Sequence, residues 1–180
     1  MTQVIFENVR IETERLIIRH MRPTDAKGLF AMMSDQNFCD EDGGYKAISA
    51  MDERFMQLVE SFSKETNRFA IALKDTDEMI GLIHLMKPLE ERAVTAVEIG
   101  YGIAPSYQRR GYGSEAVGMM VDYCHNRLQI QMVLAGAFDF NAKSQRLLEK
   151  LNFEKEGITR CACDHPSHGM TDMVNYFHMK

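Results

Sequence analysis

One stretch of the sequence, residues 93–138, limits the possible folds more than any other. It begins with AVTAVEIGYGI, in which residues alternate with the period of two that is typical of a strand. The turn QRRGYG follows, then an apolar helical pattern from about Gly113 to Arg127, and then IQMVLAGAF, which is typical of a buried strand. A strand, a helix and a second strand in succession predict a parallel pair joined by a crossover helix.

The segments on either side of this stretch predict antiparallel pairing. Two strand patterns, RFAIALK and MIGLIHLMK, are separated by DTDE, a suitable hairpin turn. Further strands are expected at ERLIIRH and around CDHPSHGMTD, and helices at residues 22–34, 51–62 and 141–153. A polar, acidic loop, CDEDGGYKA, is expected between the first two helices. The predicted fold class is α/β (an α+β mixed sheet), with a central, mostly antiparallel sheet and helices on both faces.

Composition and charge restrict the kind of protein. The chain has 180 residues without repeats or linkers, so a single domain over residues 1–180 is expected. No apolar run reaches the length of a membrane span, and the first residues lack the pattern of a signal peptide. The net charge of −5 disfavours nucleic acid as a partner. We expect a cytoplasmic protein that binds neither nucleic acid nor membrane, with its cysteines reduced.

The glycine-rich turn has the features of an anion site. The first turn of the following helix leaves backbone N–H groups without intrahelical partners, at the positive end of the helix dipole. Gly111 and Gly113 would let a ligand approach these groups, and Arg109 and Arg110 add cationic donors. A phosphate or pyrophosphate cradle is one interpretation, and a tight solvated turn is the other. The P-loop pattern and the third glycine of a Rossmann motif are both missing.

Two further elements favour a ligand. Gly100 and Gly102 share one face of the strand, where glycine is unfavourable unless a bulge or a ligand needs the space. Asn141 is a favoured N-cap of the helix NAKSQRLLEKL, and Ser144 shares the inward face of its leucines. Capping alone would explain Asn141. It explains an inward Ser144 less well, so a ligand contact is the alternative.

Taken together, VEIGYGIAPSYQRRGYGSEAV and NAKSQRLLEKLNFEKEG resemble the GNAT superfamily of N-acetyltransferases, and most closely its ribosomal-protein N-terminal, or Rim-type, branch. The segment IETERLIIRHMRPTDAKGLFAMMSD is similar to the same branch, so the resemblance covers nearly the whole chain from about Ile11. It implies a GNAT-like acyl-CoA N-acyltransferase fold. It also implies an enzyme that uses acetyl-CoA as co-substrate, needs no metal and acetylates an amine.

The resemblance also implies roles for individual residues. In the family, backbone amides of the glycine loop bind the pyrophosphate of acetyl-CoA, and a splayed strand pair admits the pantetheine arm. Ser144 matches a hydroxyl near the thioester sulfur, which makes it a catalytic candidate as well as a binding one. The residues that match the cofactor contacts are Ile103, Arg109, Arg110, Gly111, Tyr112, Gly113, Ser114, Asn141 and Ser144.

The implied chemistry is direct attack of a neutral amine on a thioester in a ternary complex. A free amine is mostly protonated at pH 7, so some group must take a proton. Glu98 is the predicted base, directly or through water, because it faces the same side of its strand as Gly100 and Gly102. A structural ion pair is the alternative for Glu98. His84 is interpreted as a satisfied core or sheet-face histidine rather than a base.

The sequence leaves the acceptor open between a protein N-terminus and a small-molecule amine. The acidic residues Asp40, Glu41 and Asp42 would attract a cationic acceptor, or they belong to a solvated loop. A catalytically silent CoA-binding or sensor module of the same fold is the competing function. A monomer or a homodimer is expected.

The segment CACDHPSHG contains side chains of the types that bind zinc. These are Cys161, Cys163, His165 and His168, but their spacing is not one of the usual zinc patterns. We therefore prefer an ordinary hairpin, with the two cysteines on one face of a strand and the two histidines in the turn.

Overall fold

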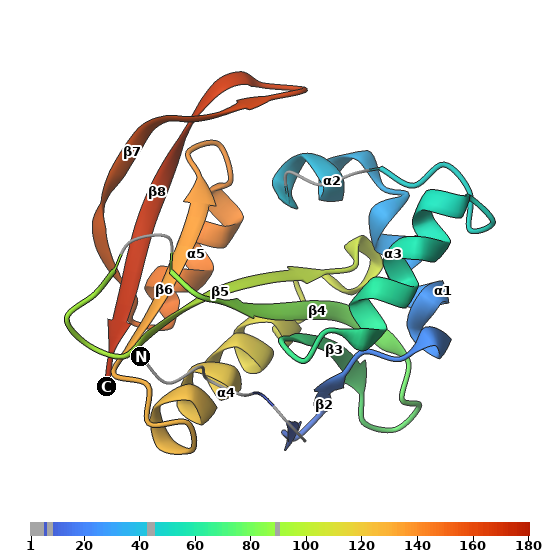
Figure 1. Ribbon diagram of the computed structural model, residues 1–180, viewed down its shortest axis with the longest axis horizontal. Coiled ribbons are helices and arrows are strands. Elements are labelled where there is room, and N and C mark those ends of the chain that lie inside the picture. Colours follow the sequence, from blue (N-terminus) through green and yellow to red (C-terminus); the bar gives the residue numbers. More distant parts are fainter. Residues whose placement is uncertain (1–5, 7–8, 43–45, 89–90) are drawn as a thin grey trace. The chain divides into compact units, whose positions relative to one another are not determined.

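The computed structural model (Figure 1) describes residues 6, 9–42, 46–88 and 91–180. Within them, the strands are β1 (Arg10–Glu12), β2 (Leu16–His20), β3 (Arg68–Leu73), β4 (Met79–Met86), β5 (Ala96–Ile103), β6 (Met132–Phe138), β7 (Glu154–His165) and β8 (Gly169–Met179). The helices are α1 (Ala26–Met33), α2 (Gln36–Asp42), α3 (Glu53–Lys64), α4 (Tyr112–Asn126) and α5 (Ala142–Lys150), with short 3-10 turns η1 (Pro23–Asp25) and η2 (Pro105–Tyr107). The strands are hydrogen-bonded in the order β1-β2-β3-β4-β5-β6-β8-β7 as one mixed sheet. The predicted mixed α/β fold is confirmed.

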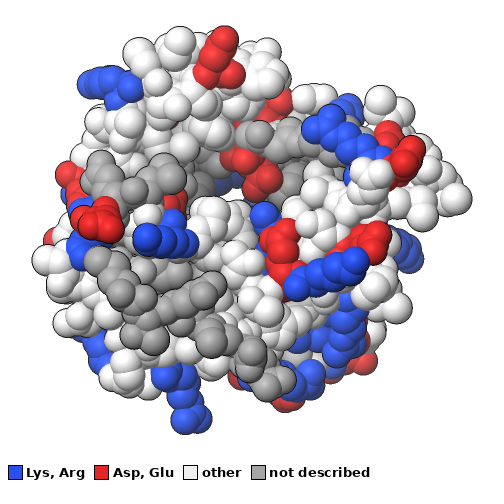
Figure 2. Space-filling view, viewed as in Figure 1, with Lys and Arg blue, Asp and Glu red and all other residues white. Residues whose placement is uncertain are grey.

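Contacts divide the chain into two compact units. The first comprises Met1–His84 with Tyr101–Met120, and the second comprises Leu85–Gly100 with Val121–Lys180. Three elements, β4, β5 and α4, therefore contribute residues to both units. Basic and acidic side chains are interspersed on the face drawn in Figure 2. Among the described residues, no helix combines the length and the apolar character needed to cross a bilayer.

The first unit is built on an antiparallel sheet. β1 pairs with β2, β2 with β3 and β3 with β4, and Ile18 lies opposite Ile71. Both faces of β3 are buried, because Phe69 and Ile71 are as inaccessible as Ala70 between them. The hairpin expected at DTDE is confirmed, and its turn contains Asp77 at a left-handed φ of 55°.

Helices α1, α2 and α3 pack on this sheet through an apolar cluster. Leu29, Phe38 and Phe55 come from the three helices in turn. They belong to the same cluster as Ala70 of β3 and Leu82 of β4. Burying a side chain of this size contributes about 1.5–3 kcal/mol. The predicted helical pattern at α1 and α3 is therefore confirmed, and its apolar side anchors both helices.

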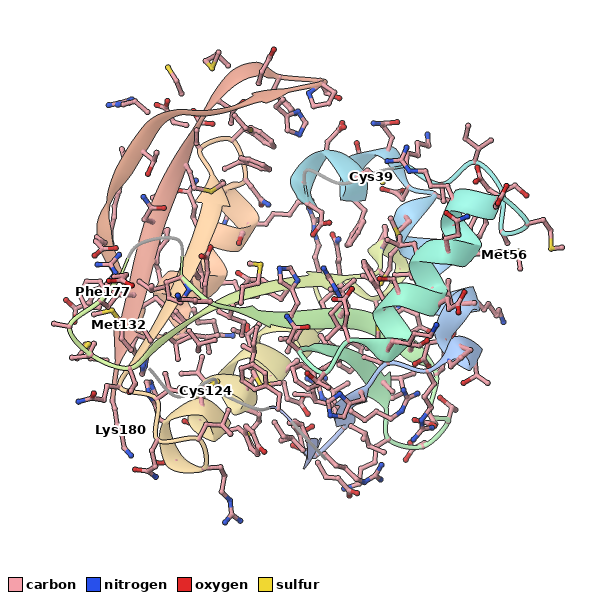
Figure 3. All side chains as sticks on the ribbon, viewed as in Figure 1. Cys39, Met56, Cys124, Met132, Phe177 and Lys180 are labelled. Carbon is pink, nitrogen blue, oxygen red and sulfur yellow. The ribbon has the colours of Figure 1, made fainter. Side chains whose placement is uncertain are left out.

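The acidic segment between the first two predicted helices is not a loop throughout. Residues Cys39–Asp42 belong to α2, so the prediction of a loop is wrong for them. Figure 3 shows Cys39 on α2, where its buried thiol donates to the carbonyl oxygen of Met33 at 3.2 Å. A helix of seven residues, rich in Asp and Asn, has too few apolar positions to show a period. Gly43, Gly44 and Tyr45 of the same segment lie outside the described residues.

A buried charge network joins β2, η1 and the β3–β4 turn. Arg19 is 4% exposed and donates to both carboxylate oxygens of Asp25, at 2.8 and 2.9 Å. Its Nε donates to Asp77 at 2.8 Å, and Arg22 donates to the other oxygen of Asp77. The hydrogen bonds with Asp25 and then Asp77 raise the pKa of Arg19 above its ordinary value. Removing the Arg19 side chain would leave the buried Asp25 carboxylate without its cationic partner, at a cost of about 3–5 kcal/mol.

The second unit contains the parallel pair that the sequence predicts. β5 pairs in parallel with β6 through residues 96–98. β6 also pairs antiparallel with β8, and β8 pairs with β7 in a long hairpin (Figure 1). The two strands of the tail are longer than expected, so the turn between them contains only residues 166–168.

A bulge in β7 contradicts one expectation. The sequence pattern predicts that Cys161 and Cys163 share one face of a strand. The register instead shifts between Thr159 and Cys163, and Cys161 has a φ of 52°. Its backbone N–H donates to Asp172 at 2.9 Å, outside the regular ladder. The bulge therefore breaks the alternation on which the prediction depends.

Close packing at the end of β5 gives a test of this fold. A Cβ on Gly102 would lie 2.7 and 2.8 Å from two ring atoms of Phe38, so Gly102→Ala should lower the free energy of unfolding by about 1–3 kcal/mol. Gly157→Ala is the control, because a Cβ there would have no neighbour within 4 Å, and it should change stability by less than about 0.5 kcal/mol. Urea denaturation measures both. Equal losses in the two variants would contradict the packing described.

Candidate functional site

The turn between β5 and α4 has an unusual backbone conformation. Arg109 has a φ of 61° and Gly111 a φ of 83°, both in the left-handed region. Glycine adopts such angles at little cost, whereas a residue with a Cβ is strained there. A Cβ on Gly111 would also lie 3.3 Å from Nη2 of Arg15. Conformation and space therefore both favour glycine at position 111.

The first turn of α4 presents unpaired backbone donors. α4 begins at Tyr112, one residue before its predicted start, and the N–H of Glu115 donates to the carbonyl oxygen of Gly111 at 3.1 Å. Within the described residues, the N–H groups of Tyr112, Gly113 and Ser114 have no protein acceptor. Three donors at the positive end of a helix dipole suit a phosphate or pyrophosphate. The geometry is compatible with the anion cradle, one of the two interpretations of this turn.

Arg15, between β1 and β2, holds this turn from outside. Its Nη1 donates to the carbonyl oxygen of Arg110 at 3.0 Å, and its Nε donates to Oε2 of Glu115 at 2.7 Å. The backbone N–H of Arg15 and the hydroxyl of Thr13 both donate to Oε1 of Glu115. The guanidinium also lies over the ring of Tyr112, 4.6 Å from its centroid. One side chain thus contacts both the turn and the first residues of the helix.

The charge at this turn is positive. Arg15, Arg109 and Arg110 contribute three positive charges and Glu115 one negative charge, a net of +2. Burial raises the pKa of Glu115, but hydrogen bonds from Thr13 and Arg15 outweigh burial and hold that pKa below its ordinary value. The Glu115 carboxylate is therefore ionised and already paired. It opposes an approaching anion less than a free carboxylate would.

The end of β5 is joined to the turn by a side chain. The carbonyl oxygen of Ile103 accepts a hydrogen bond from Nε2 of Gln108 at 3.1 Å. The neighbouring Gly102 is packed by the ring of Phe38, which fills the space above it. The interpretation that Gly102 leaves room for a ligand is therefore wrong, and helix packing explains this glycine.

In the second unit, Glu98 is the last residue of β5 that pairs with β6. β6 continues beyond this point, and a Cβ on its Gly136 would lie 4.0 Å from Oε1 of Glu98. Burial raises the pKa of the half-buried Glu98 above its ordinary value. Within the described part of the chain, its carboxylate has no hydrogen-bond or ion-pair partner. The alternative of a structural ion pair is therefore not supported.

The start of α5 carries the remaining predicted residues. Oδ1 of Asn141 accepts a hydrogen bond from the backbone N–H of Ser144 at 3.1 Å, so the predicted N-cap is confirmed. Ser144 is half-buried, and Leu148, one turn later on the same side, is fully buried. Ser144 therefore lies toward the inward side of α5, as its spacing predicts.

The predicted residues fall into two groups, one in each unit. The first unit holds Ile103 and residues 109–114, and the second holds Glu98, Asn141 and Ser144. Sequence reasoning missed Arg15, which lies 100 residues before Glu115 and has no local pattern that marks it. Periodicity and motif spacing report only on neighbours along the chain, so such a contact needs a structure.

His84 differs from its interpretation. It lies on β4 opposite Arg68, which agrees with a sheet-face position. Its Nδ1, however, is buried and has no hydrogen-bond partner among the described residues, so it is not satisfied. Burial, and then the charge of Arg68, lower the pKa of His84 to about 4. The imidazole is therefore neutral at pH 7.

Two histidines near the β7–β8 turn pack against phenylalanine rings: His165 ends β7, and His168 lies in the turn. His165 is 3% exposed and contacts Phe138 and Phe140, and His168 stacks on Phe140. In the part of the chain that the structure describes, no group of three or more His, Cys, Asp and Glu side chains is arranged to hold a metal.

His84 gives a prediction for the dependence of stability on pH. Its pKa is depressed in the folded protein, so between about pH 6.5 and pH 4 the unfolded chain binds a proton that the folded chain does not. The free energy of unfolding should therefore fall as the pH falls through this window. His84→Leu should lose less stability than the wild type between pH 7 and pH 5, measured by urea denaturation at each pH. Parallel losses in the two proteins would contradict the buried, neutral imidazole.

Known proteins are similar to this chain in sequence and in fold. Residues 15–154 match the acetyltransferase (GNAT) domain family. YoaA, an uncharacterized N-acetyltransferase of Bacillus subtilis (strain 168), is 35% identical over 159 residues, which cover 83% of this chain and 85% of YoaA. The ribosomal protein uS5-alanine N-acetyltransferase of Escherichia coli (strain K12) is 26% identical over 167 residues, covering 84% and 81% of the two chains.

Solved structures agree with these relatives. A GNAT-family acetyltransferase from Bacillus anthracis superimposes with a TM-score of 0.82 at 23% identity, over 95% of this chain and 98% of that one. The family match covers well over half of the chain, and the glycine turn that it includes has the geometry described above. The chain therefore belongs to the GNAT family of acetyltransferases and has Rim-type enzymes among its relatives.

Proposed function

We propose that this protein transfers the acetyl group of acetyl-CoA to a primary amine, either a protein N-terminus or a small amine, by direct attack in a ternary complex. The observation that carries the proposal is the row of unpaired N–H groups at Tyr112, Gly113 and Ser114. It stands beside a turn with a net charge of +2 from three arginines and one glutamate. We also propose that residues 1–180 act as a single acetyltransferase domain.

The turn would hold the pyrophosphate of the donor. The backbone N–H groups of Tyr112, Gly113 and Ser114 have no protein acceptor among the described residues, so they are available without breaking a bond. Arg109 and Arg110 are exposed and would add charge-assisted hydrogen bonds. The guanidinium of Arg110 already lies over the ring of Tyr107, 5.5 Å from its centroid, which limits its freedom. Arg110 is therefore the better side-chain candidate of the two.

The pantetheine arm would be held by backbone and amide groups. On β5, pairing with β6 stops at Glu98, so the backbone groups that follow it in the second unit are not used in that ladder. Ile103 is the proposed backbone contact at the strand end. The Asn141 amide and the Ser144 hydroxyl, at the start of α5, would contact the arm and the thioester sulfur respectively. Ser144 would hydrogen-bond the departing thiolate.

Glu98 would take the proton from the amine, directly or through water. An amine is a nucleophile only when it is neutral, and burial raises the pKa of Glu98 toward the range in which a carboxylate accepts a proton well. Its lack of an ion-pair partner among the described residues leaves the carboxylate available for this role. Activity should rise with pH as Glu98 ionises.

The acceptor would be cationic before it is deprotonated. Asp40, Glu41 and Asp42 form the end of α2. An acidic helix end attracts amines and does not select among them. A relative that acetylates the alanine of ribosomal protein uS5 supports a protein N-terminus as one candidate.

A thiol-release screen with acetyl-CoA tests the proposal. The panel should contain polyamines, amino acid amides and short peptides with free N-termini, and at least one should release CoA faster than water does. Glu98→Gln should lower kcat on the active amine by about 100-fold and leave the affinity for acetyl-CoA within about threefold, because general-base catalysis contributes about that much. Glu154→Gln, an exposed glutamate of β7, is the control. Tight acetyl-CoA binding without turnover on any amine would favour a sensor instead.

The Arg15 contacts give a second prediction. Arg15→Met should weaken acetyl-CoA binding about tenfold, because the side-chain hydrogen bonds to the Arg110 carbonyl and to Glu115 are lost and Glu115 no longer has a cationic partner beside the proposed anion site. Arg10→Met is the matched control, since it removes an exposed arginine whose ion pair with Glu12 lies within β1. It should change affinity by less than twofold in calorimetric titrations. If both variants lost affinity equally, the overall positive charge of the protein, and not the Arg15 contacts at the turn, would govern acetyl-CoA binding.

A further inference from the structure

The turn between β7 and β8 is packed against the loop between β6 and α5. The ring of Phe140 lies between two others: Phe138 stacks on it with centroids 5.3 Å apart, and His168 stacks on it at 3.8 Å and an interplanar angle of 17°. His165 meets both phenylalanines edge-on, at 5.4 Å from each. Four rings of the second unit therefore form one cluster: Phe138 ends β6 and Phe140 follows it in the loop, while His165 ends β7 and His168 follows it in the turn.

Hydrogen bonds to backbone atoms of the same loop hold it from two other sides. The N–H of Asp139 donates to the carbonyl oxygen of Asp172 on β8 at 3.0 Å. Nε2 of Gln145 on α5 donates to the carbonyl oxygens of Phe138 and Asp139, at 3.1 and 3.0 Å. The loop is thus fixed by β8, by α5 and by the ring cluster. Of these three, only the ring cluster holds Phe140 itself by its side chain.

Phe140 directly precedes Asn141, which has an irregular backbone conformation with φ −85° and ψ 66°. No helix or strand ladder imposes these angles, so the surrounding contacts must set them. The conformation decides where the Asn141 side chain lies and how it caps Ser144. Holding the Phe140 ring therefore also holds the two residues that follow it in the proposed donor site.

The histidines do more here than fill space. His168 is exposed, so its stack on Phe140 gains little from burial and mainly fixes the orientation of the ring. His165 is buried, and its Nδ1 accepts a hydrogen bond from the N–H of Ser167 at 3.1 Å, which closes the turn. The N–H of His168 in turn donates to the carbonyl oxygen of His165. Hydrogen bonds within the turn thus order it independently of its contact with Phe140.

We propose that His165 and His168 are positioning residues for the acetyl donor: they clamp Phe140 and thereby hold Asn141 and Ser144 in the geometry that binds it. This inference rests on the proposed function. It assigns a role to the two histidines at the tip of the β7–β8 hairpin.

His168→Ala tests the clamp with two measurements, calorimetric titration with acetyl-CoA and amide hydrogen exchange at Ser144. We expect acetyl-CoA affinity to fall about three- to tenfold, the size of one aromatic contact, and exchange at Ser144 to accelerate. His168→Phe keeps the stack and should restore both values. Phe140→Leu keeps apolar volume without the stack and should behave like His168→Ala. Met170→Ala, exposed in the same hairpin, is the control and should change neither.

The outcomes separate the inference from the proposed function. If the wild type does not bind acetyl-CoA, the proposed function fails, and exchange at Ser144 still reports on the clamp. If the wild type binds and His168→Ala matches it in both measurements, the clamp is overturned. A His168→Phe variant that remains as weak as His168→Ala would also overturn it, because the stack would then not be the cause.

Discussion

The glycine turn between β5 and α4 depends on the contacts of Arg15. Two residues of this turn, Arg109 and Gly111, have left-handed φ angles, a region in which a residue with a Cβ is strained. Arg15 stabilises the turn from outside by donating hydrogen bonds to the Arg110 carbonyl and to Glu115. The donors at the start of α4 can then remain unpaired and fixed in direction, which is the preorganisation that anion binding needs. The Arg15 side chain thus both stabilises the turn and adds positive charge beside it.

The second unit contributes a different kind of constraint. Its parallel pair stops at Glu98, and the carboxylate that it leaves beside Gly136 is half-buried without an ionic partner among the described residues. Ionising such a carboxyl group costs free energy, because burial disfavours its charged form. The start of α5 is held differently, by the Asn141 cap and by the ring cluster beside it.

Much of the fold was predictable, because periodicity and turn chemistry act over a few residues. The strand, turn and helix around QRRGYG, the DTDE hairpin and the Asn141 cap were all visible in this way. Three features were not. The seven residues of α2 are too few to show a period, the bulge at Cys161 needs the register of β8, and Arg15 acts at long range. For Gly102 the sequence suggested a ligand where the structure has side-chain packing. In the sequence alone, a glycine that makes room for the Phe38 ring cannot be distinguished from one that makes room for a ligand.

The central claim is that the unpaired amides of the first turn of α4 receive the pyrophosphate of acetyl-CoA. The most direct test is a titration followed by amide chemical shifts, with acetyl-CoA and with acetyl-pantetheine, which lacks the pyrophosphate. The account predicts large shifts at Tyr112, Gly113 and Ser114 with acetyl-CoA, and small ones with acetyl-pantetheine. Equal shifts with both compounds, or none at these three amides with acetyl-CoA, would contradict it.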